Sequence, residues 1–64
     1  MLNFAICDDN VNILDKLPKM LENIFLKYNY DACIGFKSDD FDEIVEYVGD
    51  NKTDVLILDI NLKN

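Results

Sequence analysis

The chain has 64 residues, which is enough for one small domain and too few for two. Half of its residues are apolar, as in folded globular proteins, and a net charge of −7 with no histidine argues against a surface that binds a nucleic-acid backbone. The chain has no apolar run of about 18 residues and no secretory signal pattern at its start. We therefore expect no membrane span and, as the default, a cytoplasmic location.

The first predicted elements are a strand and a long helix. Residues 3–7 form a nearly continuous apolar run, typical of a strand covered on both faces of a parallel sheet. Apolar residues then recur at steps of one, three and four, which predicts a helix that begins near Val11 with Asn10 or Asn12 as its cap. Pro18 lies inside this pattern and lacks an amide hydrogen, so a kink or a late start is expected.

A second strand and a shorter helix follow. Residues 30–36 alternate between apolar and small or polar side chains, which predicts an edge strand with one less covered face. Ser38 is a plausible cap for a helix whose apolar stripe lies between residues 41 and 48. Asp39 and Asp40 suit the positive end of this helix, and Gly49 is its expected stop.

Residues 54–59 are too few and too rich in branched side chains for a helix and predict a third strand. The alternation of strands and helices indicates an α/β protein of β-α-β-α-β order, with a parallel sheet and right-handed crossovers. Cys7 and Cys33 lie inside strand-like runs and lack the spacing of a metal or redox pair, so we expect both to be reduced and structural.

Three carboxylates follow two of the predicted strands. Asp8 and Asp9 close the first strand and Asp59 closes the third. Ligands of open parallel sheets bind beyond the carboxyl ends of the strands, and clustered carboxylates with an adjacent phosphate are the setting in which Mg²⁺ binds. Taken singly, each of the three is more often a helix cap or a turn residue; their matching positions favour a metal-dependent phosphate site.

The segments FAICDDN at residues 4–10 and VLILDIN at residues 55–61 resemble the first and third strands of response-regulator receiver domains. Within that family they are most similar to receivers that carry a LytTR-type DNA-binding output. The resemblance implies a flavodoxin-like fold of sheet order 2-1-3-4-5, of which residues 1–64 supply the order 2-1-3, with strands four and five missing. We therefore expect a partial receiver domain without an output domain.

The resemblance also implies a role for each site residue. Asp59 is the expected phosphoacceptor, and Asp8 and Asp9 are the acidic pair that holds Mg²⁺ together with Asp59 and the backbone carbonyl of Asn61. A carboxylate accepts a phosphoryl group as an acyl phosphate, and the metal neutralises charge on the transferred oxygens. The chain is then a phosphoprotein and not an enzyme.

Partners follow from the same resemblance. A sensor histidine kinase is the expected phosphodonor, and Val11, Asn12 and Asp15 are candidates for its contact surface. DNA is reached only through the missing output domain. A third strand without its neighbours is an open sheet edge, so we also expect self-association, most simply two chains that pair their third strands about a two-fold axis.

The same residues allow three other interpretations. A phosphatase of the haloacid-dehalogenase type places its nucleophile similarly but needs a second acid where this chain has Asn61. A calcium loop starting at Asp8 fails because Ile13 and Lys19 occupy its glycine and glutamate positions. The third is an inactive, dimerising α/β fragment without phosphotransfer, and it stays open.

Overall fold

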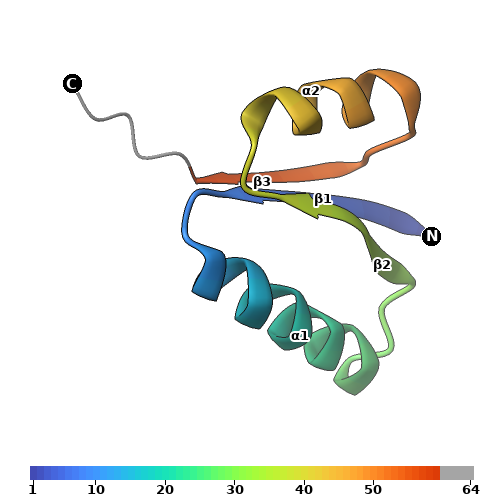
Figure 1. The fold of residues 1–64 in the computed structure, drawn as a ribbon. Coiled ribbons are helices and arrows are strands. Elements are labelled where there is room, and N and C mark those ends of the chain that lie inside the picture. Colours follow the sequence, from blue (N-terminus) through green and yellow to red (C-terminus); the bar gives the residue numbers. More distant parts are fainter. Residues whose placement is uncertain (60–64) are drawn as a thin grey trace.

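A computed structural model describes residues 1–59 of the chain. The elements follow one another as β1 (Leu2–Asp8), α1 (Val11–Lys27), β2 (Ala32–Ser38), α2 (Phe41–Asp50) and β3 (Val55–Asp59). The three strands form one parallel sheet in the order β2-β1-β3. Helix α1 lies on one face of this sheet and α2 on the other (Figure 1). The predicted α/β class and the order 2-1-3 are confirmed, and the layout matches the first three strands of a flavodoxin-like sheet.

The core lies on both faces of the central strand. Ala5, Ile6 and Cys7 of β1 are almost completely buried, because a helix covers each face. On the α1 side, the rings of Phe4 and Phe25 lie 5.0 Å apart. The opposite side is filled largely by Ile44 of α2, which is 1% exposed. The nearly continuous apolar run of β1 therefore forms a strand that is buried on both faces, as the sequence predicted.

Helix α1 begins at Val11, as predicted, with Asn10 as its cap. The Asn10 side chain accepts hydrogen bonds from the amides of Asn12 at 2.9 Å and Ile13 at 3.4 Å, two of the donors that a helix start leaves free. The expectation of a late start at Pro18 is wrong, because the helix runs through it to Lys27. Pro18 is itself buried.

Strand β2 begins and ends two residues later than predicted and contains a bulge. The register with β1 shifts at Gly35, so that Ile34 pairs with Phe4 while Phe36 pairs with Ala5. Register partners of parallel strands point to the same face, so Ile34 lies on the α1 side and Phe36 on the α2 side, where it stacks on Tyr47 at 4.5 Å. Simple alternation had placed Ile34 and Phe36 on one face, which is wrong.

The cap and the end of α2 also differ from expectation. Asp40, and not Ser38, is the cap: its side chain accepts from the amide of Asp42 at 2.9 Å. Ser38 ends β2 and supports the turn, because its hydroxyl accepts from the amide of Asp40 at 3.0 Å and donates to the Glu43 carboxylate. The helix continues through Gly49 to Asp50.

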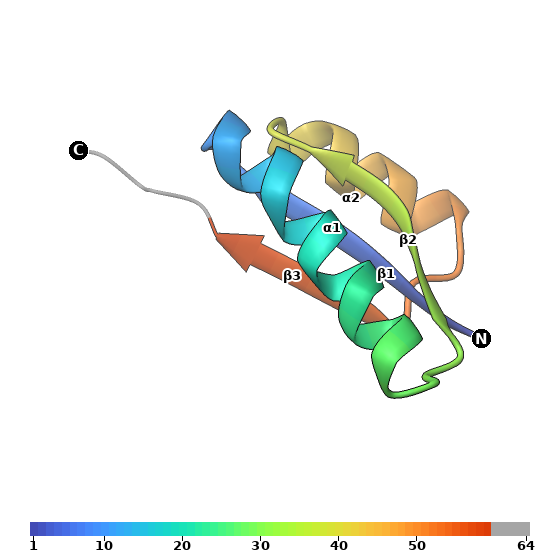
Figure 2. The same cartoon turned by 90° about the horizontal axis from the view of Figure 1, so that it is seen from below.

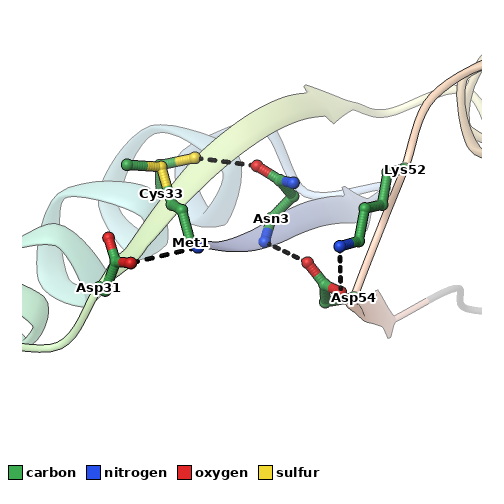
Figure 3. Close-up of polar contacts among 6 residues, drawn as sticks. All are labelled: Met1, Asn3, Asp31, Cys33, Lys52 and Asp54. Carbon is green, nitrogen blue, oxygen red and sulfur yellow. Dashed lines mark hydrogen bonds and ion pairs between the residues drawn. The ribbon is translucent and has the colours of Figure 1, made fainter.

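Polar contacts join the three strands at their amino ends (Figure 3). The amide of Asn3 in β1 donates to the Asp54 carboxylate at 2.8 Å, and the amide of Asp54 donates to the Asn3 carbonyl at 2.8 Å. The Asn3 side chain also accepts from the Cys33 thiol of β2 at 3.3 Å. These contacts fix where β3 starts against β1.

Both cysteines are free, with Cys7 buried and Cys33 half-buried, which agrees with the predicted reduced state. Of the two helices in residues 1–59, neither has the length and apolar character that a membrane crossing requires.

Candidate functional site at the carboxyl ends of the strands

Asp8 and Asp59 are direct register partners on neighbouring parallel strands. Asp8 is the last residue of β1 and Asp59 the last of β3, and the two are paired across the sheet. Asp9 follows Asp8 in the turn that leads into α1. The structure therefore places the three predicted carboxylates at one edge of the sheet, where β1 meets the start of α1 (Figures 1 and 2).

The three carboxylates differ in their surroundings. Asp8 is 4% exposed, and one of its oxygens accepts a hydrogen bond from the amide of Asn10 at 2.8 Å. That bond holds the Asp8 side chain in the β1–α1 turn. Asp9 and Asp59 are exposed to solvent. The edge thus combines one fixed, buried carboxylate with two accessible ones.

Two further carboxylates face the same edge. Asp39 and Asp40 follow β2, whose end lies beside the end of β1. The sequence interpretation assigned them only to the start of α2; the rule that parallel strands end at one edge would have placed them here as well. Both are exposed to solvent, and one oxygen of Asp40 is occupied as the α2 cap.

The negative charge at this edge also affects the pKa of the Cys7 thiol. Its pKa is raised, first by burial and then by the charges of Asp40, Asp8, Asp39 and Asp9. Ion pairs between side chains in residues 1–59 involve other acids, so none of these four carboxylates is neutralised by a lysine there. A negative edge of this kind favours a cation.

The residues fit Mg²⁺ in their chemistry, because carboxylate oxygens are ligands that this ion prefers. Within residues 1–59, however, no three acidic, histidine or cysteine side chains are gathered closely enough to hold a metal as they stand. Asn61, the fourth predicted ligand, lies outside the described residues. The four-ligand Mg²⁺ site therefore stays a prediction, supported by the pairing of Asp8 with Asp59.

The predicted kinase-contact residues lie on the first turns of α1, next to this edge. Val11, Asn12 and Asp15 are all exposed, and Asp15 forms an ion pair with Lys19 at 3.5 Å. Their exposure leaves them available to a partner.

In comparisons with protein-family models, with curated proteins and with solved structures, the chain has no significant match.

Proposed function

We propose that residues 1–64 form the phosphate-accepting part of a response-regulator receiver domain, in which a sensor histidine kinase phosphorylates Asp59 in the presence of Mg²⁺. The observation that carries the proposal is the pairing of Asp8 with Asp59 at the carboxyl ends of neighbouring strands. The order β2-β1-β3 supports it, because ligands of such sheets bind at this edge.

Each carboxylate has a distinct part in the proposed reaction. An exposed Asp59 oxygen attacks the phosphorus of a phosphohistidine, and a P–O bond forms as the P–N bond breaks, with the electron pair left on the histidine nitrogen. Asp8, which the amide of Asn10 fixes in place, and Asp9 would hold Mg²⁺ together with Asp59 and the carbonyl of Asn61. When bound, Mg²⁺ neutralises charge on the phosphoryl oxygens.

The signal passes to transcription through an output domain outside these 64 residues. Val11, Asn12 and Asp15 are the proposed contacts of the kinase, because they are exposed on the helix that begins beside the acidic edge. The chain is a phosphoprotein substrate in this scheme, since Asp59 is modified and does not turn over.

The test is a Mg²⁺ titration followed by NMR, and then an acyl-phosphate donor with the intact mass as readout. We expect saturable shifts around Asp8 and Asp59 and one phosphate adduct that requires Mg²⁺. Asp59→Asn should weaken the shifts and abolish the adduct. The matched control is Asp50→Asn, which removes an equal charge from an exposed residue at the end of α2.

Absence of both binding and adduct in the folded wild-type chain would refute phosphoacceptance and leave an inert, associating α/β fragment. An adduct that persists in Asp59→Asn would move the acceptor to another residue. Continuous release of phosphate from an aryl phosphate would instead support the haloacid-dehalogenase interpretation.

A further inference from the structure

Strand β2 pairs with β1 on its inner side and lies at the margin of the sheet away from β3 (Figure 2). In a flavodoxin-like sheet of order 2-1-3-4-5 the second strand is outermost, so β2 is an edge irrespective of what pairs with β3. The outer side of β2 therefore belongs to the surface of this fold. Its outward backbone groups are open to another strand.

The hydrogen bonding of β2 shows which backbone groups point outward. The carbonyl of Asp31, the residue before β2, accepts from the amide of Leu2 in β1 at 2.8 Å, so it points inward. Successive residues of a strand turn their amide and carbonyl alternately to its two sides. The groups of Cys33 therefore also point to β1. Those of Ala32 and Ile34 point to the outer side, where residues 1–59 provide no strand.

Two hollows lie along this edge, between α1 and β2. They have volumes of about 320 Å³ and about 390 Å³, and Glu22 lines both, so they adjoin. Together they form what we call the α1–β2 groove, lined by Pro18, Glu22, Phe25 and Leu26 of α1 and by residues 32–37. Consecutive β2 residues line the groove although their side chains alternate between the two faces, so the groove reaches the outer backbone of the strand.

The α1–β2 groove changes in character along its length. Near the start of β2 it contains the buried Phe25, and Leu26 and Tyr30 beside it are 82% and 60% exposed. Apolar side chains exposed to this degree beside a hollow favour an apolar group between them. Glu22, where the two hollows adjoin, is exposed and forms no ion pair with any of residues 1–59. A lysine or arginine side chain complements its charge.

We propose that the α1–β2 groove binds an extended peptide segment of a partner protein, which pairs with the outer side of β2 as an added strand. An apolar side chain of the peptide lies between Leu26 and Tyr30, and a lysine or arginine two residues away lies against Glu22. The spacing of two follows from the pairing, because side chains two apart in a strand point to the same face. Hydrogen bonds to the backbone of Ala32 and Ile34 give affinity, and the two side chains give selectivity.

The bulge at Gly35 limits the length of this pairing. It interrupts the regular alternation of backbone groups after Ile34, so a partner strand finds them in order only over the first half of β2. A short peptide suits such an edge better than a long strand does. The inference goes beyond the proposed function and does not depend on it, because Asp8, Asp9 and Asp59 do not line the groove.

The first experiment selects binders from a displayed library of short random peptides on the folded wild-type chain. We expect enriched sequences that hold an apolar residue and a lysine or arginine two positions apart. A synthetic copy of the enriched peptide is then the probe, and its affinity should fall with added salt, because the chain carries a net charge of −7. An empty selection, or enriched sequences without a basic residue, would overturn the proposal.

Amide hydrogen exchange followed by NMR locates the probe on the wild-type chain and needs no variant to fold. Exchange at the outward amides of Ala32 and Ile34 should slow about tenfold or more when the probe saturates the chain. The amide of Cys33 is the internal control, because it already points to β1 and should change little. Protection confined to other residues would overturn the proposal. Protection of Ala32 and Ile34 without the probe, together with a doubled mass, would overturn it in favour of a second copy.

Glu22→Gln tests the charged contact. This change should weaken binding of the probe about two- to fivefold, as expected for an exposed ion pair, and should abolish the preference for a probe with lysine over one with glutamine. Asp42→Asn is the matched control, since it removes an equal charge from an exposed residue of α2 that does not line the groove. Equal weakening by the two variants would show that net charge alone attracts the peptide and would overturn the contact with Glu22.

Discussion

The Lys37 ammonium of β2 donates a hydrogen bond to the Leu14 carbonyl of α1 at 3.2 Å. Leu14 lies four residues before Pro18, so its carbonyl is the one that a proline at position 18 leaves without a helical donor. A side chain from the neighbouring strand thus satisfies the acceptor, and the helix continues where the sequence alone predicts a fault. This contact explains why Pro18 neither delays nor ends α1.

Lys37→Met should destabilise the folded chain by about 1 kcal/mol, because the Leu14 carbonyl then loses its donor while the apolar stem is kept. In a Pro18→Ala background the same change should cost almost nothing, since the alanine amide at position 18 bonds to that carbonyl. The measurement is urea unfolding of the four chains of this double-mutant cycle, with an expected coupling of about 1 kcal/mol. Additive effects of the two substitutions on the free energy of unfolding would show that Lys37 does not compensate for the hydrogen bond that Pro18 removes.

Gly35→Ala should destabilise the chain by about 1 kcal/mol, because a β-carbon there would lie 2.8 Å from the Tyr47 hydroxyl. The ring of Tyr47 would have to move off Phe36, on which it stacks. Combining the change with Tyr47→Phe removes the crowding oxygen and should recover most of the loss. Thermal unfolding of the single and double variants checks this, and no recovery would place the strain in the backbone of the bulge.

Asp54→Ala should destabilise the chain by about 1–2 kcal/mol, since the Asn3 amide loses a charged acceptor at the junction of β1 and β3. Asp54→Asn keeps an acceptor oxygen and should cost less. Lys52→Ala should have almost no effect, because the Lys52–Asp54 ion pair is long at 3.9 Å and Lys52 is exposed. Chemical unfolding ranks the three variants, and equal losses for Asp54→Ala and Lys52→Ala would contradict the assignment.

The two cysteines should react with a thiol reagent at very different rates. Cys7 is 1% exposed and its pKa is raised by burial and by the surrounding carboxylates, so little thiolate forms and little is accessible. Cys33 is half-buried and should be labelled first. Mass spectrometry of the native chain over time gives the order, with the unfolded chain as the control in which both react. Faster labelling of Cys7 would mean that β1 opens locally.

The raised pKa of Cys7 also sets a dependence of stability on pH. The folded state holds the thiol proton more tightly than the unfolded state, so its contribution is fully present below the unfolded pKa of about 8.5 and is lost as pH rises through the folded pKa. The free energy of unfolding should therefore fall above about pH 8.5. Cys7→Ala should lower the free energy of unfolding at every pH, but it should also make that free energy less dependent on pH in the alkaline range. Unfolding curves measured between neutral and alkaline pH will test this.

Much of the fold follows from local signals. The continuous apolar run of β1 predicted a strand buried on both faces, and the helical spacing after Asn10 predicted α1 with its start and cap. The short branched run before Asp59 predicted β3. These signals are reliable because backbone hydrogen bonding and the burial of one face depend on residues close together in the chain.

The candidate site was predicted to a similar depth. The rule that parallel strands end at one edge brings Asp8 and Asp59 together, and the register confirms this pairing. Asp39 was predicted only as part of the start of α2, although the end of β2 brings it to this edge as well. Metal binding at Asp8, Asp9, Asp59 and Asn61 stays a prediction that titration will decide.

The sequence by itself determined the kinds of element, their order and the ends at which the carboxylates lie. Only the tertiary structure decided that Gly35 forms a bulge, that Lys37 serves the carbonyl opposite Pro18, and that β3 is left bare by both helices. The reason is physical: each of these features depends on which distant segments meet across the sheet. A local sequence pattern predicts which side chains of a helix or strand can be buried. Only the packed fold determines which distant residues they contact.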